Sequence, residues 1–457
     1  MAETLRSVGL DVGTTSTQMI LSELTVENRA SGFAVPDMEI TRRKILYKSP
    51  VRFTPLLDES HMDGEALRRM VEEEYRLAGI TRETVDTGAI IITGETSRKE
   101  NARTVLDALS SLAGDFVVAT AGPDLESMLA AKGAGAESYS EKTGRKLLHF
   151  DIGGGTSNLA LLDGGKLLGT GCLNVGGRLI KMDESGTVTY VSPVLRGLCD
   201  LRPGEKLSRE QEEETAALLA RALEMAAGLR EPDGLLEKLT TAGTSRLPLP
   251  GTEGNTVISF SGGVADCIRE ELPGRSFGDI GPALGRAIRN SRLCRGEYRL
   301  GEETIRATVI GAGCHSAQLS GSTVFCRDTA LPIQNIPVLS LNRQQQEESL
   351  TECIRRGLTE GEEDPVIALP GIRSPSYRQV TAMAEKILAG FSGRNLRICL
   401  EEDMAKALGQ ALASRTEKGR GILCLDGVRL SPGSYLDVGA PVGPAMPIVV
   451  KTLILNQ

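Results

Sequence analysis

Several features that define familiar classes of protein are missing from this 457-residue sequence. Its nine cysteines are odd in number, scattered and never spaced as C-x-x-C, so the sequence predicts neither a disulfide framework nor a zinc site. Histidine occurs only three times, and we expect His149 to be a core residue rather than a ligand or a base. Thiol and imidazole chemistry are therefore poor candidates for the function.

An excess of positive charge and long apolar runs are also absent from the sequence. The formal net charge is −8, whereas a surface that binds nucleic acid or anionic membranes needs concentrated Lys and Arg. No apolar run approaches the roughly 18 residues of a membrane span, and no charged-then-apolar leader precedes Ser7. We therefore expect a cytoplasmic protein with neither a nucleic-acid nor a membrane partner.

Glycine, in contrast, is plentiful. The chain has 52 glycines, about 11% of its residues against a usual value of roughly 7%. They lie in short clusters, so tight turns and close backbone approaches explain them better than disorder does. The length predicts about three domains, at roughly 150 residues each.

Two of the glycine clusters share one design, and we call them the first and second cradles. Residues 151–157 read DIGGGTS and residues 11–17 read DVGTTST, each after an apolar run. Placing Asp11 on Asp151 also places Gly13 on Gly153, at an offset of 140 residues. Each cradle is predicted to be a β-hairpin, and neither matches the Walker pattern G-x-x-x-x-G-K-[ST]. Two matched cradles indicate two related halves that face one ligand.

The cradles suit a nucleoside triphosphate held without a Walker lysine. Its charge must then be neutralised by Mg²⁺ and by aligned backbone N–H groups, which glycine allows to approach closely. Asp11 and Asp151 stand at the edges of the cradles, where they could hold Mg²⁺ or its waters. The predicted phosphate-binding residues are Gly13, Thr14, Thr15, Gly153, Gly154, Gly155, Thr156 and Ser157.

A third glycine turn lies between a predicted strand and a predicted helix in residues 256–272. We expect Ser261, Gly262 and Gly263 to contact the nucleoside, although a Gly-Gly pair alone is also typical of an ordinary helix entry. Asp279 is interpreted as a helix cap. ATP and Mg²⁺ are thus the expected ligands.

Periodicity and capping residues predict the other elements and three domains, 1–135, 136–320 and 321–457. Ser208 and Gln211 form a capping-box pattern before a helix, and 228–254 is predicted to be loop. Residues 306–313 are a strand or a helix entry, and residues after 321 alternate strand and helix. The other predicted elements are a helix at 63–78, strands at 85–94 and 115–120, and helices at 101–113 and 122–133.

The order of these motifs resembles the actin–Hsp70–sugar kinase superfamily. The matching segments are 11–17, 122–133, 151–157, 259–266 and 308–313, in the family's order of first phosphate, first connecting, second phosphate, adenosine and second connecting motifs. The resemblance implies an α/β fold of duplicated actin/Hsp70-like (ribonuclease H-like) lobes around a nucleotide cleft. The C-terminal α/β region would be an addition that could dock a partner.

The chain more specifically resembles the ethanolamine ammonia-lyase reactivating factor family, EutA. The similar segments are 7–18, 88–95, 114–123, 172–178 and 306–313. This resemblance implies a chaperone-like, ATP-dependent reactivase whose partner is adenosylcobalamin-dependent ethanolamine ammonia-lyase. It would release damaged cobalamin so that adenosylcobalamin can rebind, in the cytoplasm and in association with a bacterial microcompartment.

One position departs from the superfamily pattern. Gly122 stands where Hsp70-like and bacterial actin-like members carry the Glu that positions the hydrolytic water. Asp124 or Glu126 could substitute, and Glu126, one turn into the helix, is the candidate that joins Asp11 and Asp151 as catalytic residues. We therefore expect a slow ATPase. Two other functions use the same fold, a small-molecule kinase, for which no base can be assigned, and a filament-forming actin-like protein.

Overall fold

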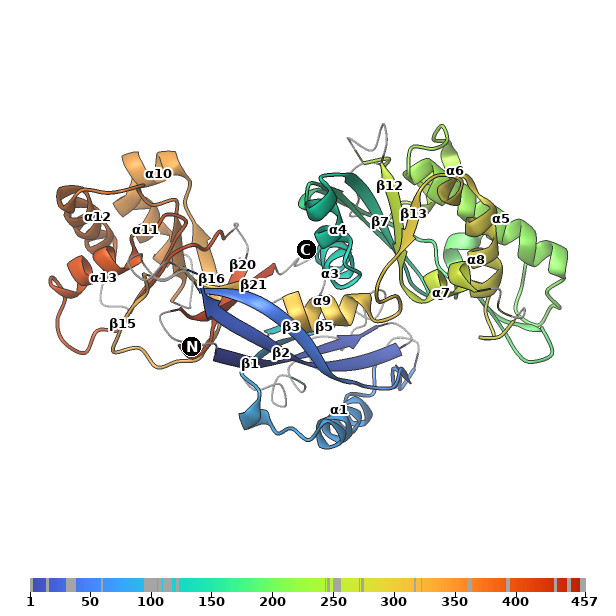
Figure 1. Ribbon diagram of the computed structural model, residues 1–457, viewed down its shortest axis with the longest axis horizontal. Coiled ribbons are helices and arrows are strands. Elements are labelled where there is room, and N and C mark those ends of the chain that lie inside the picture. Colours follow the sequence, from blue (N-terminus) through green and yellow to red (C-terminus); the bar gives the residue numbers. More distant parts are fainter. Residues whose placement is uncertain are drawn as a thin grey trace.

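The computed structural model describes residues 3–13, 16–29, 38–58, 61–93, 105, 109, 117–120, 123–242, 244, 247–249, 256–270, 272, 275–315, 318–321, 323–359, 364–391, 395–430, 434–441 and 445–452. These residues build three large sheets that follow one another along the chain. In Figure 1 the first sheet, in blue, lies between a green-to-yellow body and an orange-to-red body.

The first sheet has the strand order β3-β2-β1-β5-β6, and β4 pairs with β2. The predicted hairpin is present, because β1 and β2 are antiparallel, whereas β5 runs parallel to β1. Helix α1 begins after the Asp63 cap and ends at Gly79, whose φ of 68° suits glycine. The elements are β1 Glu3–Val12, β2 Ser16–Asn28, β3 Met38–Lys48, β4 Arg52–Phe53, α1 Gly64–Ala78, η1 Arg82–Thr84, β5 Thr87–Ile92 and β6 Val117–Thr120.

The second sheet repeats this topology. Its order β9-β8-β7-β12-β13 corresponds strand by strand to β3-β2-β1-β5-β6, with β7 and β8 antiparallel and β12 parallel to β7. The duplicated fold predicted from the two cradles is therefore confirmed. The strands are β7 Lys146–Ile152, β8 Ser157–Asp163, β9 Lys166–Leu173, β12 Val257–Ser261 and β13 Tyr298–Leu300, with a separate pair β10 Ile180–Met182 and β11 Val188–Val191.

Helices cover the second sheet, and several of them were not predicted. The capping box of Ser208 and Gln211 is present at the start of α5. In the predicted loop 228–254, α6 forms because Asp233 caps it and its three leucines are buried, so the loop prediction was wrong there. The helices are α4 Ala136–Thr143, η3 Pro193–Leu195, α5 Arg209–Ala226, α6 Gly234–Leu239, α7 Gly263–Arg269, α8 Gly281–Asn290 and η4 Arg292–Cys294.

Two helices are exchanged between the duplicated halves. Helix α3, Pro123–Gly133, follows the first sheet but packs against strands β7, β8 and β9, whereas α9, Ala307–His315, follows the second sheet and packs against β1, β2 and β5. The two helices cross at glycines, because a Cβ on Gly311 would lie 2.0 Å from the carbonyl oxygen of Leu129. Residues 307–315 are thus helix, and this crossing holds the halves together (Figure 1).

The C-terminal region contains both strands and helices, as predicted. Strands β16, β17, β18 and β19 are parallel neighbours, and helices between them bury an apolar cluster that includes Ile354, Ile387 and Leu408. The elements are β14 Gln318–Leu319, β15 Phe325–Arg327, β16 Ile333–Ser340, α10 Arg343–Glu348, α11 Leu350–Thr359, β17 Val366–Leu369, α12 Tyr377–Gly390, β18 Leu396–Leu400, α13 Ala405–Ala413, β19 Ile422–Leu425, β20 Ser434–Val438 and β21 Pro447–Thr452.

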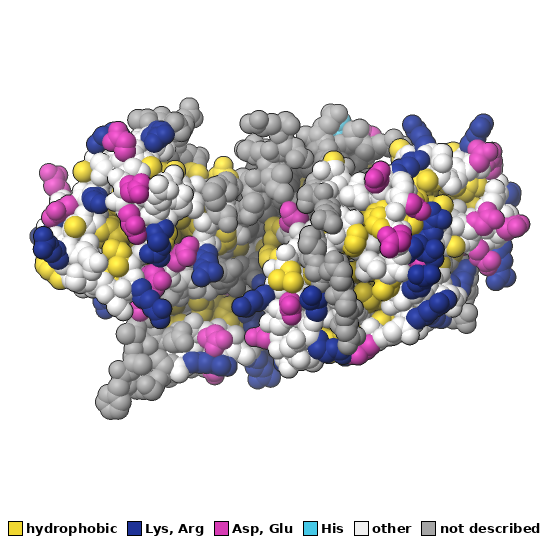
Figure 2. Space-filling model, turned by 90° about the horizontal axis from the view of Figure 1, so that it is seen from above, with side chains coloured by type: hydrophobic (Ala, Val, Ile, Leu, Met, Phe, Trp, Pro, Cys, Tyr) yellow, Lys and Arg dark blue, Asp and Glu magenta, His cyan; other side chains and the backbone are white. Residues whose placement is uncertain are grey.

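The proposed domain boundaries at 135 and 320 stay a prediction. Of the predicted helix 101–113, the structure describes only Val105 and Leu109, both helical. No helix in the described parts of the chain is both long and apolar enough to cross a membrane. On the face shown in Figure 2, Lys and Arg side chains are interspersed with Asp and Glu.

Candidate functional site

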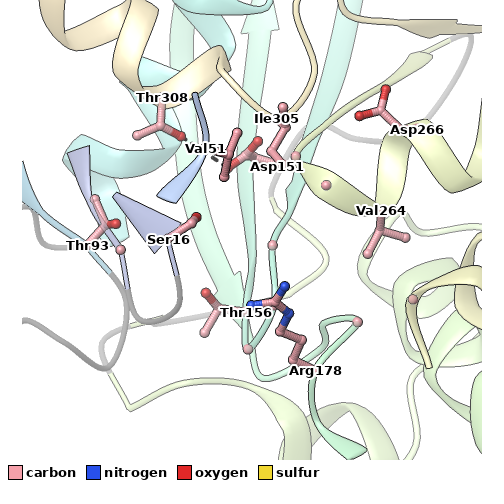
Figure 3. A pocket seen from close by; sticks show the side chains of 18 of the residues that line it. Ser16, Val51, Thr93, Asp151, Thr156, Arg178, Val264, Asp266, Ile305 and Thr308 are labelled. Atoms are coloured by element: carbon pink, nitrogen blue, oxygen red, sulfur yellow. Dashed lines mark hydrogen bonds between the residues drawn. The ribbon is translucent and has the colours of Figure 1, made fainter. Parts of the chain in front are cut away.

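A cavity of about 260 Å³ lies between the two related sheets, at the ends of β1 and β7. Figure 3 shows Thr93 and Ser16 on one side of it and Asp151, Thr156 and Arg178 on the other. Ten residues predicted for the site line this cavity: Asp11, Gly13, Glu126, Asp151, Gly153, Gly154, Gly155, Thr156, Gly262 and Gly263. Thr14, Thr15 and Gly122 lie outside the described residues.

The two cradles share the hydrogen bond that closes their turns. The Gly13 N–H donates to the Ser16 carbonyl oxygen at 2.9 Å, and the Gly153 N–H donates to the Thr156 carbonyl oxygen at 2.9 Å. These are the pairs that the 140-residue offset places on one another. Each turn also sits between two antiparallel strands, so the cavity is bounded by two copies of one backbone motif.

Asp151 is the more deeply placed of the two cradle carboxylates. The hydroxyl of Ser261 donates to its Oδ1, and the hydroxyl of Thr308 donates to its Oδ2 at 3.3 Å. Burial raises the pKa of Asp151 to about 6, although both hydrogen bonds act in the opposite direction. Near neutral pH the site thus holds a carboxylate that has lost most of its hydration.

Asp11 occupies the matching place in the first cradle. The Thr93 hydroxyl donates to its Oδ1 at 2.8 Å. Burial raises the pKa of Asp11 to about 7, the Thr93 hydrogen bond lowers it, and the negative charge of Asp151 raises it further. The two carboxylates therefore repel each other across the cavity, and a bound cation would relieve both the repulsion and the desolvation.

An amide side chain stands opposite each carboxylate in the sheet register. Gln18 pairs with Asp11 between β1 and β2, and Asn158 pairs with Asp151 between β7 and β8. Both side chains are buried, and Gln18 Oε1 and Asn158 Oδ1 have no hydrogen-bond partner among the described residues. Buried acceptors need donors, and carboxylates together with amide oxygens form a ligand set suited to Mg²⁺ and its waters. Asp11, Asp151 and Gln18, which line the cavity, therefore fit the predicted metal ion.

Two predicted contact residues use their hydroxyls inside the protein instead. Ser157 is fully buried, and its hydroxyl donates to the Val175 carbonyl oxygen at 2.7 Å. Ser261 is also fully buried and donates to Asp151. Neither side chain lines the cavity, so Ser157 supports the second cradle and Ser261 orients a carboxylate, whereas the sequence prediction had placed both against the ligand.

His149 is a core residue, as expected. It is completely buried, and its ring nitrogens lie 2.8 Å from the Ser259 hydroxyl and 2.9 Å from the Ser261 hydroxyl. Burial lowers the pKa of His149 to about 3. The ring is thus neutral at physiological pH and belongs to the polar network behind Asp151.

The structure separates the two candidates for the water-positioning residue. Glu126, in the first turns of α3, lines the cavity. The carboxylate of Asp124 instead accepts a hydrogen bond from the Thr170 hydroxyl, and Asp124 is exposed and does not line the cavity. Of the two, only Glu126 is placed to act on a ligand.

Sequence reasoning did not identify several residues that shape the site: Gln18, Thr93, Arg178, Asp266 and Thr308. Thr93 could have been found, because it directly follows the buried strand that pairs with β1. Asp279 accepts the Gly281 N–H, but the N-cap residue of α8 is Ile280, so the cap prediction was wrong, and Asp279 also accepts from Arg178. That second contact joins residues 101 positions apart and has no local pattern.

Comparison with known proteins places the chain in context. The family model described as "Ethanolamine utilisation protein EutA" matches residues 3–456. The chain is 39% identical to "Ethanolamine ammonia-lyase reactivase EutA" of Salmonella typhimurium and 38% identical to the protein of that name from Escherichia coli, over 98% of each chain in both cases.

Solved structures of lower similarity were also found. A Ppx/GppA family member from Aquifex aeolicus has a TM-score of 0.43 and 14% identity, covering 68% of this chain and 97% of that one. The ethanolamine utilisation protein EutJ from Carboxydothermus hydrogenoformans has a TM-score of 0.35 and 17% identity, covering 67% and 88%.

Proposed function

Because the chain belongs to the ethanolamine utilisation protein EutA family, we propose that it is an ATP-dependent reactivase of ethanolamine ammonia-lyase. In this role it releases damaged cobalamin from the inactivated lyase so that adenosylcobalamin can rebind. The similarity to proteins named as reactivases extends over 98% of the chain. We also propose, from the family resemblance, that it works in the cytoplasm in association with a bacterial microcompartment.

The observation that carries the nucleotide part of this proposal is the pair of matched acidic cradles that face one cavity. Asp11, Asp151 and the amide oxygen of Gln18, which line the cavity, would hold Mg²⁺ and its waters. When bound, Mg²⁺ supplies positive charge against the phosphates of ATP. The backbone of Gly154 and Gly155 offers N–H groups to the phosphates, and the Gly262-Gly263 turn approaches the nucleoside.

Hydrolysis depends on a carboxylate that can orient water. Glu126 lines the cavity from α3 and takes this role in the proposal. It is carried by the same helix that crosses α9 at Gly133 and Gly311, so a change at the phosphates can be transmitted to the angle between the halves. The C-terminal region 321–457 is not needed to form the cavity, and we propose it as the docking region for the lyase.

Reactivation can be measured directly. Ethanolamine ammonia-lyase blocked with cyanocobalamin is mixed with this protein, Mg-ATP and adenosylcobalamin, and ammonia or acetaldehyde release is followed. We expect activity to return with ATP, and to stay low when ATP is omitted or when Asp151→Asn replaces the wild type. No recovery with the wild type, under conditions in which the unblocked lyase is active, would contradict the proposal.

A further inference from the structure

Arg178 is the only positively charged side chain among the described residues that line the cavity. The acidic groups there are Asp11, Glu126, Asp151, Asp266 and Asp279. A nucleoside triphosphate carries about four negative charges, and Mg²⁺ can offset only part of them. An anion that enters such an acidic cavity needs a further cation, and Arg178 is the one that the described lining offers.

The backbone holds Arg178 directly against the second cradle. Its N–H donates to the Gly154 carbonyl oxygen at 2.7 Å, and the Gly177 N–H donates to the Gly153 carbonyl oxygen at 3.0 Å. A Cβ on Gly176 would lie 2.3 Å from the Gly154 carbonyl oxygen, so glycine is required for this approach. The loop after β9 is therefore fixed to the turn that was predicted to bind phosphate.

One edge of the Arg178 guanidinium is held by Asp279, and its other edge is available to a ligand. Its Nε donates to Asp279 Oδ2 at 3.1 Å, and Asp279 is itself held by the Gly281 N–H at 2.9 Å. The two terminal nitrogens make no hydrogen bond to a described residue, and the side chain is 27% exposed. Figure 3 shows the guanidinium next to Thr156, directed into the cavity.

We propose that Arg178 binds the terminal phosphate of the nucleotide, an inference that rests on the ATP-dependent function proposed above. The planar guanidinium presents paired N–H donors that match two phosphate oxygens. Asp279 serves as a positioning residue, because it fixes the orientation of the guanidinium before the ligand arrives.

Arg178 also reaches the other half of the molecule. Its Cζ lies 5.8 Å from the centroid of the Phe53 ring, and Phe53 belongs to β4 of the first sheet. This contact links the loop that carries Arg178 to the first sheet. Phe53 is 77% exposed, so its contact with Arg178 contributes only modestly.

The inference is tested by measuring the affinities of ATP, ADP and AMP, each with Mg²⁺, by titration calorimetry for the wild type, Arg178→Gln and Arg178→Lys. We expect Arg178→Gln to weaken ATP binding roughly 10- to 100-fold, ADP less, and AMP least, since AMP lacks the terminal phosphates. Arg178→Lys should recover part of the loss, because it restores the charge but not the paired donors. An equal loss for all three nucleotides, or no loss, would overturn the inference.

Two controls separate this result from general charge and folding effects. Arg145→Gln removes the same charge from the surface pair with Glu297, and it should leave all three affinities unchanged. Thermal unfolding of each variant shows whether Arg178→Gln is folded. If it is not, the ratio of ATP to AMP affinity in Arg178→Lys decides whether the inference holds. If the wild type binds no nucleotide, the proposed function fails as well. If the wild type binds ATP and Arg178→Gln binds it with the same affinity, only the role of Arg178 is removed.

The link to the other half is tested by Phe53→Ala. We expect ATP affinity to fall roughly 2- to 5-fold, the range of an exposed cation–π contact, with AMP affinity unchanged. Affinities for ATP that match the wild type would remove Phe53 from the inference.

Discussion

The hydroxyl of Ser261 donates a hydrogen bond to Asp151, and this contact determines which nitrogen of His149 carries the proton. A hydroxyl has one proton, so Ser261 can only accept from His149 Nε2, which is 2.9 Å away. His149 Nδ1 is then unprotonated and accepts from the Ser259 hydroxyl at 2.8 Å. The buried network behind Asp151 is therefore built around a neutral imidazole.

This arrangement makes the folded protein less stable as the pH falls below 6.5. The pKa of His149 is about 3 in the folded protein against an ordinary 6.5, so below pH 6.5 the unfolded chain binds a proton that the folded protein does not. Stability from this residue is complete above pH 6.5 and falls by up to about 1.4 kcal/mol per pH unit until pH 3. We expect denaturant unfolding at pH 7.5 and 5.5 to show a loss about 1 kcal/mol larger for the wild type than for His149→Gln. Equal losses in the two proteins would argue against a neutral buried His149.

Asp151→Asn should affect stability and ligand binding in opposite directions. Burial raises the pKa of Asp151 from 3.8 to about 6, so the stability of the free protein falls as pH rises through this range and is lowest above it. The neutral amide removes that cost, and we expect the free energy of unfolding at pH 8 without nucleotide to rise by about 1–3 kcal/mol.

The same substitution should weaken Mg-ATP binding at least tenfold, because a buried charged ligand group is lost. Asp11→Asn should also weaken it, since Asp11 lines the same cavity from the first cradle. Calorimetric titration and phosphate release measure the two effects. Unchanged nucleotide affinity and turnover in both variants would contradict the cradle assignment.

Glu126→Gln and Asp124→Asn form a matched pair on α3. We expect Glu126→Gln to bind Mg-ATP with wild-type affinity and to hydrolyse it at least tenfold more slowly, because a positioned base typically contributes about 100-fold or more. Asp124→Asn should hydrolyse at the wild-type rate, since Asp124 contacts Thr170 outside the cavity. Single-turnover phosphate release compares them, and a defect confined to Asp124→Asn would reverse the assignment.

Gly311→Ala tests the crossing of α3 and α9. The added methyl group would lie 2.0 Å from the Leu129 carbonyl oxygen, so the helices must separate. We expect the free energy of unfolding to fall by about 1–3 kcal/mol, the usual cost of overpacking. Gly234→Ala on α6 is the control, because its methyl group would meet no other described part of the chain within 4 Å, and its effect should stay within about 0.5 kcal/mol. Equal stability of the two variants would mean that α3 and α9 can move apart at their crossing without loss of stability.

Local features of this protein were determined by its sequence. The hairpins of the two cradles, the capping box at Ser208 and the left-handed end of α1 at Gly79 depend on residues within a few positions of one another. Their hydrogen bonds and φ angles follow from local residue types. Each cradle is such a local pattern, and its second occurrence 140 residues later predicted the duplicated fold. Helix α6 was missed because burial of its leucines, rather than its Pro- and Gly-rich surroundings, decides its conformation.

Only the tertiary structure decided how the side chains of the site are used. Ser261 reaches Asp151 across 110 positions, and Arg178 reaches Asp279 across 101. These contacts depend on the parallel register of β7 and β12 and on where the loop after β9 is fixed to the second cradle. Sequence spacing carries no information about such distances, because sheet pairing and helix crossing bring together residues whose separation along the chain is arbitrary.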